Sequence, residues 1–408
     1  MRIKLHHPGQ QAKGNITITG SKSESNRLLI LQALYPQIKI KNGSNSDDSS
    51  VTQEALKSNG QRIDIHHAGT AMRFLTAYFA TQVDRETVLT GSKRMQERPI
   101  KLLVDALNSL GADISYDKET GFPPLKIRGK QLTENKVSLP GNISSQYISA
   151  LMLIAPSLKN GLEIVLTDEI TSVPYITMTQ SILDDLGFDT SFKGNKISIR
   201  PGTMTHPQEW TVESDWSSAS YFYSIVALAA EGEIDLSYYA PESRQGDAAL
   251  EKIYRNLGVE TTFDGGKIKL SKIKNFVTPD HIALNLKNTP DLAQTIAVSC
   301  LGLGTDCLLT GLHTLKIKET DRLTALKVEM EKLGAKVEIT DNSLVLTHAK
   351  TLNSDVAIAT YNDHRMAMAF APLGLRVPIV INDAEVVSKS YPGFWDDLQT
   401  IGFNRDIF

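Results

Sequence analysis

Glycines recur at long, regular intervals along this chain, each after an apolar residue or an asparagine and before a strand-like run. The six glycines are Gly60, Gly111, Gly187, Gly258, Gly334 and Gly402. Successive intervals between them are 51, 76, 71, 76 and 68 residues. A glycine that follows a helix adopts the left-handed C′ conformation at little cost. A regular period of this length predicts repeated supersecondary units, and the short first interval predicts that one unit is shortened.

Polar residues suited to helix N-termini recur with a matching rhythm, and each precedes an apolar run. They lie near Ser21, Thr70, Ser144, Asp215, Asp291 and Asp363. Strand-like runs at 87–90, 162–166, 267–270 and 343–347 separate the helices. Helix and strand therefore alternate in about six α/β units, packed as compact domains. Ordinary α/β alternation with coincidental spacing is the alternative interpretation.

Length and charge narrow the function classes. A chain of 408 residues is long enough for two domains. Its net charge of −3 argues against bulk binding of nucleic acid. The two cysteines, Cys300 and Cys307, share one apolar region, so we expect core thiols in a cytoplasmic protein. We also expect no signal peptide and no membrane span, because the longest apolar run, around 150–155, is too short.

Cationic residues stand where helices are expected to begin. Lys22 and Arg27 lie among hydroxyls just before or within the start of the apolar run 28–34, and similar patterns recur at 318–322 and 362–365. A cation at a helix N-terminus opposes the helix dipole unless an anion lies beside it. Three such segments favour an anion-binding site. The alternative is a set of ordinary N-caps whose basic neighbours face solvent.

Several common catalytic motifs are absent from the sequence. It contains no P-loop, the Gly302-Leu303-Gly304 run lacks the third glycine of a dinucleotide fingerprint, and no histidine pair has metal-ligand spacing. No nucleophile elbow occurs either. The chemistry is therefore expected from Lys, Arg, Asp, Glu, Ser and backbone groups, with no metal or cofactor.

A series of motifs spans nearly the whole chain in a fixed order. These are Gly20–Arg27, Ser46–Asp48, Ala68–Arg73, Arg94–Pro99, Ser144–Gln146, Ser172–Tyr175, Gln245–Asp247, Pro290–Asp291, Lys318–Arg322, Asp363–Met368 and Lys389–Pro392. By these motifs the chain resembles the 5-enolpyruvylshikimate-3-phosphate synthases of the enolpyruvyl transferase family. The resemblance implies an α/β fold of two similar domains, each with three βαβαββ repeats, whose helix N-termini face an inter-domain cleft that closes on ligands. It places one domain at 1–20 with 214–408 and the other at 21–213.

The resemblance also implies an activity. The enzyme would transfer the enolpyruvyl group of phosphoenolpyruvate to the 5-hydroxyl of shikimate 3-phosphate and release phosphate, a step of the shikimate pathway to aromatic amino acids. Its partners would be these two small molecules, with no nucleic acid and no membrane. We expect a cytoplasmic monomer.

Site residues are carried over by the resemblance. The phosphoenolpyruvate set is Lys22, Gly69, Arg98, Gln146, Arg322, Arg365 and Lys389. The shikimate 3-phosphate set is Lys22, Ser23, Arg27, Ser144, Ser145, Gln146, Ser172, Tyr175, Asp291 and Lys318. Catalysis falls to Asp291, Glu319 and Lys22. Two carboxylates in different electrostatic settings divide acid and base work, with Asp291 expected to take the hydroxyl proton and Glu319 to serve the carbon centre.

Three residues depart from the family pattern, and two rival functions stay open. His67 stands in place of an asparagine, Phe74 in place of a proline, and Thr314 in place of a substrate-contacting asparagine. The first rival adds enolpyruvate to UDP-N-acetylglucosamine. That enzyme would show Lys-Asn at Lys22-Ser23 and a reactive loop cysteine. The second rival is a non-catalytic protein of the same repeat fold that binds anions or RNA ends.

Overall fold

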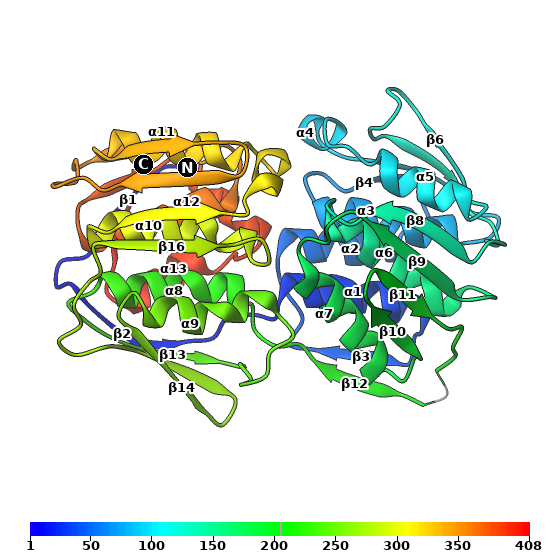
Figure 1. The fold of residues 1–408 in the computed structure, drawn as a ribbon, viewed down its shortest axis with the longest axis horizontal. Helices are drawn as coiled ribbons and strands as arrows, with labels where there is room; N and C mark the ends of the chain where they lie inside the picture. Colours follow the sequence, from blue (N-terminus) through cyan, green and yellow to red (C-terminus); the bar gives the residue numbers. More distant parts are fainter. Residues whose placement is uncertain (205) are drawn as a thin grey trace. The chain divides into compact units, whose positions relative to one another are not determined.

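The structure, a computed structural model, describes residues 1–204 and 206–408 of the chain. It contains two compact units, coloured along the sequence in Figure 1. The first unit combines Met1–Thr19 with Glu213–Phe408, and the second is Gly20–Val212. Each boundary lies one residue before the expected one. Each unit encloses a separate hydrophobic core.

The strands within the described residues form five four-stranded sheets and one two-stranded sheet. Each four-stranded sheet has one arrangement. Its first two strands run parallel, and two antiparallel strands extend the sheet beyond the second. The helix between the first two strands makes the parallel crossover that such a pair requires. This pattern confirms the expected βαβαββ repeat.

Three of the four-stranded sheets belong to the first unit. In spatial order, one holds β2 (Gln11–Ile16), β13 (Glu231–Ser237), β15 (Lys267–Lys272) and β14 (Val259–Asp264). The next holds β16 (His281–Asn285), β17 (Asp306–Thr310), β19 (Ser343–Thr347) and β18 (Lys336–Ile339). The third holds β20 (Val356–Ile358), β21 (Ile379–Ile381), β1 (Ile3–His6) and β22 (Asn404–Ile407). In this last sheet the start of the chain supplies β1 between two strands from its end.

The second unit holds the other sheets. One contains β4 (Arg62–Asp64), β5 (Glu86–Thr90), β7 (Leu125–Arg128) and β6 (Asp113–Tyr116). Another contains β8 (Lys136–Pro140), β9 (Leu162–Thr167), β11 (Lys196–Ile199) and β10 (Thr190–Lys193). The remaining pair is β12 (Gln208–Thr211) and β3 (Ile38–Lys41), which run parallel. No strands follow α2 within that repeat in the described chain, which confirms that one unit is shortened.

Each repeat supplies one inner and one outer helix. The inner helices of the first unit are α8 (Trp216–Leu228), α10 (Ala293–Leu303) and α12 (His364–Phe370), and the outer ones are α9 (Leu250–Arg255), α11 (Arg322–Lys332) and α13 (Phe394–Thr400). In the second unit the inner helices are α1 (Lys22–Leu34), α3 (Gly69–Ala80) and α6 (Ser145–Ile154), and the outer ones are α2 (Asp47–Lys57), α5 (Lys101–Ser109) and α7 (Val173–Asp185). A short helix, α4 (Lys93–Gln96), follows β5.

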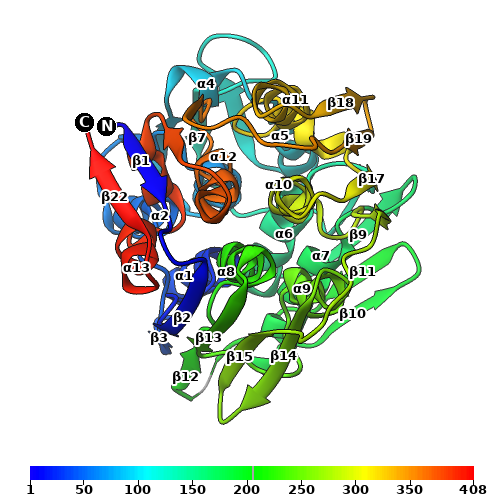
Figure 2. The same cartoon turned by 90° about the vertical axis from the view of Figure 1, so that its left-hand side faces the viewer.

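The inner helices other than α1, whose first half is polar, are apolar on nearly every side, as suits a helix at the centre of a unit. Every residue of α3 and of α12 is buried. Figure 2 shows α8, α10 and α12 near the centre of the first unit, with strands toward its outside. Three-helix packing of this kind brings the inner helices of one unit into mutual contact.

Most predicted helix ends are confirmed. Five glycines that follow helices have the left-handed conformation, with φ between 87° and 102°: Gly111, Gly187, Gly258, Gly334 and Gly402. The prediction for Gly60 is wrong, because α2 ends at Lys57 and the chain continues in extended conformation from Ser58. Thr70 does not cap its helix either. Helix α3 begins one residue earlier, at Gly69, without a side-chain cap.

Two further predictions concern the interior and the membrane. Cys300 and Cys307 are buried free thiols, which confirms their place in the core. Two causes raise the pKa of Cys300: the larger is a contact with the Cys307 thiol, and the next is burial. In residues 1–204 and 206–408, no helix combines the length and the apolar character needed to cross a bilayer.

Candidate functional site

In the first unit, polar residues at the starts of several helices form one hydrogen-bonded group. We call it the Arg322 cluster. It comprises Ser217, Asp247, Asp291, Lys318, Glu319, Arg322, Asp363 and Arg365. Ser217 lies in the first turn of α8, and Asp291 lies in the 3₁₀ turn just before α10. Arg322 begins α11, and Arg365 is the second residue of α12. The starts of α8, α10, α11 and α12 therefore all contribute residues to the cluster.

The Arg322 guanidinium lies at the centre of the cluster and is only 1% exposed. Its Nε donates to Asp363 Oδ2 at 2.7 Å, Nη1 to Asp291 Oδ1 at 2.8 Å, and Nη2 to Glu319 Oε2 at 2.8 Å. Burial alone would lower the pKa of Arg322. The charges of Asp363, Glu319 and Asp291 outweigh burial, so the net shift of the Arg322 pKa is upward.

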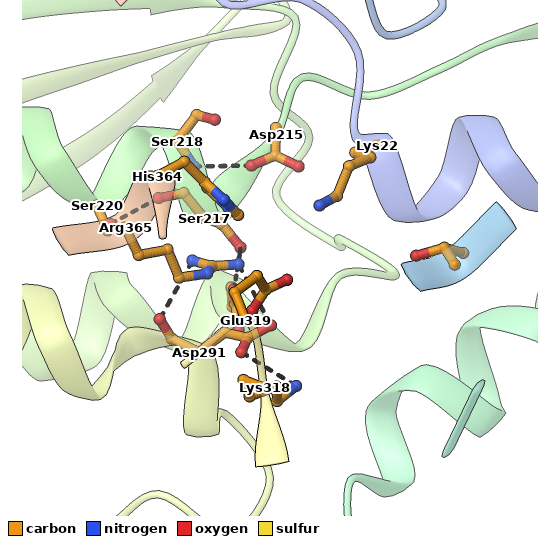
Figure 3. A network of polar contacts seen from close by, with 12 residues as sticks. Lys22, Asp215, Ser217, Ser218, Ser220, Asp291, Lys318, Glu319, His364 and Arg365 are labelled. Atoms are coloured by element: carbon orange, nitrogen blue, oxygen red, sulfur yellow. Dashed lines mark hydrogen bonds and ion pairs between the residues drawn. The ribbon is translucent and has the colours of Figure 1, made fainter. Parts of the chain in front are cut away.

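Asp291 receives two more cations in addition to Arg322. Arg365 Nη2 donates to Asp291 Oδ2 at 3.2 Å, and Lys318 Nζ lies 3.4 Å from Asp291 Oδ1 (Figure 3). Burial lowers the pKa of Lys318, although the charge of Asp291 acts in the opposite direction. One carboxylate thus contacts three cationic side chains, which concentrates positive charge around a single acidic group.

Lys389 is linked to the Arg322 cluster by a hydrogen bond to the backbone next to Asp363. It ends a 3₁₀ turn at Ala384–Lys389, and its Nζ donates to the Asn362 carbonyl oxygen at 2.6 Å. Asn362 directly precedes Asp363, which caps α12 and accepts the Arg365 backbone N–H at 2.9 Å. The sequence-predicted residues Asp291, Lys318, Glu319, Arg322, Arg365 and Lys389 are therefore brought together in the first unit.

The second unit has a corresponding group around Arg27, which is 2% exposed. The Arg27 cluster comprises Ser23, Arg27, Ser149, Tyr175 and Thr179. Arg27 Nε donates to Thr179 Oγ1 at 2.7 Å and Nη1 to the Ser23 carbonyl oxygen at 2.7 Å. Its Nη2 donates to Ser149 Oγ at 3.0 Å and to the Tyr175 carbonyl oxygen at 3.1 Å. Arg27 thereby ties α1, α6 and α7 together near their N-terminal ends.

Burial lowers the pKa of Arg27 to about 10, against the opposing influence of Tyr175 and Glu24. The guanidinium also lies 5.5 Å from the ring centroid of Phe74, a cation–π distance. Phe74 is one of the three departures from the family pattern, and α3 runs through it without interruption. At this position a large aromatic side chain supports the buried arginine.

The other residues predicted in the second unit also lie at helix starts. Lys22 is the first residue of α1, and its Nζ lies 3.9 Å from Asp48 Oδ2. Ser144 and Ser145 begin α6, and Gln146 Nε2 donates to Thr70 Oγ1 in α3 at 3.2 Å. Ser172 precedes α7 with a left-handed backbone, φ 53°.

Gly69, the first residue of α3, faces the Arg98 side chain. A Cβ atom at Gly69 would lie 2.7 Å from Arg98 Nη1, closer than such atoms approach. The glycine therefore lets Arg98, which is 8% exposed, pack against the start of the helix. The sequence-predicted residues of the second unit gather at the N-terminal ends of α1, α3, α6 and α7.

The two other departures have separate surroundings. His67 Nε2 lies 3.8 Å from Asp47 Oδ2, just before α3. The buried Thr314 hydroxyl has no hydrogen-bond partner in the part of the chain that the structure describes. An unsatisfied buried hydroxyl is costly in a folded protein. Thr314 is thus a polar group still lacking a partner four residues before Lys318.

Comparison with known proteins places this geometry in a family. The family model for EPSP synthase (3-phosphoshikimate 1-carboxyvinyltransferase) matches residues 54–398. The chain belongs to the EPSP synthase family. A relative from Bacteroides fragilis named 3-phosphoshikimate 1-carboxyvinyltransferase is 45% identical over 412 residues, with 100% of this chain and 99% of that one covered. A relative of the same name from Haemophilus influenzae is 35% identical and covers 97% of this chain and 98% of its own.

Solved structures show the same fold. An EPSP synthase from Acinetobacter baumannii superposes with a TM-score of 0.78 at 22% identity, and all of both chains is covered. The enolpyruvyl transferase NikO from Streptomyces tendae has a TM-score of 0.76 at 12% identity, with 99% of this chain and 98% of that chain covered. The EPSP synthase fold is thus maintained at low sequence identity, because the repeat pattern depends on packing periodicity rather than on particular residues.

Several polar residues near the predicted ligands, Asp247, Asp48 and Ser217 among them, had no role in the sequence-based prediction for this EPSP synthase family member. Asp247 accepts a hydrogen bond from the Ser217 hydroxyl, and Asp48 contacts Lys22. Both acids lie inside motifs that carry the resemblance, at 245–247 and 46–48, so the motifs pointed to them without giving a role. Ser217 stands in the polar helix start after Asp215, where the sequence indicates a cap but no ligand.

Replacing Asp247 by asparagine is expected to remove part of the pH dependence of stability. Burial first, and then the charge of Asp291, raise the pKa of Asp247 to about 6, while Arg365 and Ser217 oppose the rise. The unfolded carboxyl titrates near about 3.9. The folded protein therefore holds this proton more tightly. The resulting stability is fully present below about pH 4 and is lost as the pH rises through about 6.

Chemical denaturation at several pH values measures this effect. A difference of about 2 pKa units corresponds to ~3 kcal/mol. Between pH 4 and pH 7 we therefore expect the unfolding free energy of the wild type to fall about 2–3 kcal/mol further than that of Asp247→Asn. Parallel stability curves for the two proteins would contradict this assignment.

Proposed function

We propose that the Arg322 cluster and the Arg27 cluster supply the binding and catalytic groups of a 3-phosphoshikimate 1-carboxyvinyltransferase. The enzyme transfers the enolpyruvyl group of phosphoenolpyruvate to the 5-hydroxyl of shikimate 3-phosphate and releases phosphate, a step of the shikimate pathway. Membership of the EPSP synthase family carries the reaction. One observation supports the residue assignment above all. The Asp291 carboxylate contacts three cations, and one of them, Arg322, also holds a second carboxylate, Glu319.

Both substrates carry a phosphate and a carboxylate, so their repulsion must be offset. Arginine binds such groups through paired N–H donors, and lysine acts as a compact charge. The proposed phosphoenolpyruvate set is Lys22, Gly69, Arg98, Gln146, Arg322, Arg365 and Lys389. The proposed shikimate 3-phosphate set is Lys22, Ser23, Arg27, Ser144, Ser145, Gln146, Ser172, Tyr175, Asp291 and Lys318.

To bind an anion through both Nη1 and Nη2, Arg322 would exchange partners. In this structure each of its three guanidinium nitrogens already donates to a carboxylate. An incoming phosphate or carboxylate would replace Asp291 or Glu319 at Nη1 or Nη2, while the fully buried Asp363 keeps Nε. Substrate binding would thus release one of the two proposed catalytic acids from Arg322, and Asp363 would preserve the orientation of the guanidinium.

The same exchange prepares the acid–base chemistry. The carboxylate that takes the hydroxyl proton must be able to accept it, and nearby cations oppose protonation. When substrate anions neutralise Arg322, Arg365 and Lys318, that opposition weakens. We propose that Asp291 then accepts the proton of the 5-hydroxyl. Glu319 delivers a proton to the methylene carbon of phosphoenolpyruvate and later removes one from the methyl group.

Arg27 has a narrower part in binding. Guanidinium carries five N–H donors, and four hydrogen bonds within the described residues already engage it. We propose that Arg27 offers its remaining Nη1 donor to shikimate 3-phosphate and mainly fixes the helix starts that bear Ser23, Ser145 and Tyr175. The helix N-termini add backbone N–H groups suited to a phosphate.

Phosphate release is the decisive assay. The purified chain should release inorganic phosphate from phosphoenolpyruvate when shikimate 3-phosphate is present, and from neither compound alone. Release with UDP-N-acetylglucosamine as the acceptor would instead favour the sister transferase. Binding of both anions without any release would favour a non-catalytic protein. Lys13→Met, which removes an exposed ion pair with Glu231, is a control variant that should release phosphate at the wild-type rate.

A further inference from the structure

Glu329 is a buried carboxylate that the proposed chemistry does not use. It lies on α11, two turns after Arg322, and has no exposed surface. Its Oε2 accepts the Ala359 backbone N–H at 3.1 Å, and its Oε1 accepts the Tyr361 hydroxyl at 2.6 Å. Lys332 Nζ lies 2.6 Å and 2.8 Å from the two oxygens. A carboxylate buried this completely needs such partners, and two of the three belong to the segment before α12.

That segment makes an unusual turn. Tyr361 and Asn362 are consecutive non-glycine residues in the left-handed conformation, with φ 53° and φ 56°. Side chains rarely adopt this backbone, and it persists only where the surroundings fix it. The bond from the Tyr361 hydroxyl to Glu329 fixes one side chain of the turn. The hydrogen bond from the Asp363 N–H to the Thr360 carbonyl, 2.8 Å long, closes the backbone around it.

The turn at 360–363 contacts three cationic residues. The carbonyl oxygen of Asn362 accepts Lys389 Nζ at 2.6 Å. The next residue, Asp363, accepts Arg322 Nε at 2.7 Å and the Arg365 backbone N–H at 2.9 Å. A shift of the turn would therefore move Lys389 and Arg365 together and would change the orientation of Arg322.

We infer that Glu329 and Tyr361 form a clamp that positions the phosphoenolpyruvate-binding cations of the first unit, a role that rests on the proposed function. Glu329 and Tyr361 are positioning residues, because their hydrogen bonds join α11 to the turn before α12 and not to a proposed ligand residue. Through the turn they set the spacing of Lys389, Arg365 and Arg322. The clamp should therefore affect phosphoenolpyruvate much more than shikimate 3-phosphate.

Steady-state kinetics of Tyr361→Phe test the clamp. The ring keeps its packing and only the hydroxyl bond to a charged group is lost. We expect KM for phosphoenolpyruvate to rise about 3–30-fold, part of what such a bond is worth, while KM for shikimate 3-phosphate stays within about twofold. Glu329→Gln, which keeps the shape and removes the charge, should shift the same KM in the same direction.

A matched control separates positioning from a general loss of stability. Tyr254→Phe also removes a phenol hydroxyl of the first unit, the one that contacts Ser299 Oγ at 2.8 Å. It should leave both KM values unchanged, even where its thermal midpoint falls as far as that of Tyr361→Phe. An equal rise in both KM values for Tyr361→Phe, or an unchanged KM for phosphoenolpyruvate, would overturn the clamp.

A double variant distinguishes failure of the clamp from failure of the proposed function. Lys389→Met alone should raise KM for phosphoenolpyruvate, because it removes a proposed ligand. In that background Tyr361→Phe should add less than its effect in the wild type, since the turn then has one cation fewer to position. If Lys389→Met leaves KM unchanged, the ligand set is wrong. If Lys389→Met acts and Tyr361→Phe does not, only the clamp is wrong.

Discussion

Replacing Glu319 by glutamine, or Asp291 by asparagine, is expected to lower the turnover number by about 10²–10⁴-fold. Each replacement keeps the size of the side chain and removes a group that can exchange a proton. Asp291 contacts Lys318, Arg322 and Arg365, and Glu319 contacts Arg322, so both amides retain hydrogen-bonding neighbours and the cluster should stay folded. The loss should therefore appear in turnover rather than in stability.

Solvent isotope exchange into the methylene of phosphoenolpyruvate assigns the two roles. Glu319→Gln should slow this exchange at least as strongly as it slows turnover, because Glu319 is proposed to serve the carbon centre. Asp291→Asn should slow both by hindering attack of the hydroxyl. Glu331→Gln, which removes an exposed carboxylate from helix α11, should leave both rates at the wild-type level. Unchanged exchange in both active-site variants would refute the assignment of these acids.

Arg322→Met should be the most destabilising of the substitutions considered. Removing one partner of a buried ion pair typically costs about 3–5 kcal/mol, because the other charge is left uncompensated. Here three carboxylates, Asp291, Glu319 and Asp363, lose their shared cation, and Asp363 has no exposed surface. We expect a loss of about 3–5 kcal/mol in the unfolding free energy of the first unit at neutral pH, together with loss of activity.

Hydrogen exchange followed by mass spectrometry can assign this loss to one unit. Protection should fall in the first unit and stay near wild type in residues 20–204. Lys13→Met serves as the control, because its exposed pair with Glu231 should contribute about 1 kcal/mol or less. A uniform loss across both units, or a loss below about 1 kcal/mol, would show that Arg322 does not hold the three acids together.

The repeats could be predicted from the sequence because their signals are local. A capping serine at position 21 and a glycine at position 111 act within one turn of their own helix, so pattern and structure agree. Gly60 shows the limit of that reasoning. It has the same sequence context, but its repeat lacks the two antiparallel strands that normally follow the glycine, and α2 ends earlier.

The candidate site could be predicted only in part. Basic residues at helix starts conflict with the helix dipole, and that conflict indicated Lys22, Arg322 and Arg365. Glu329 gives no such signal, because charged residues flank it at 327 and 331 in an ordinary amphipathic helix. Its burial follows from the contact with Tyr361, 32 residues away, which no local pattern encodes. A positioning residue such as Glu329 can be recognised only from the residues that it contacts, and those contacts are known only once the fold is known.

The place of β1 has a consequence for biosynthesis. This strand is made before the second unit, but it pairs with β21 and β22, whose residues lie beyond position 378. At about 5–20 residues per second, the ribosome reaches them roughly 8–35 seconds after finishing the second unit. During that interval Ile3 and Leu5 remain exposed without strand partners. A nascent chain of this kind should recruit holding chaperones at β1 until β21 and β22 have been made.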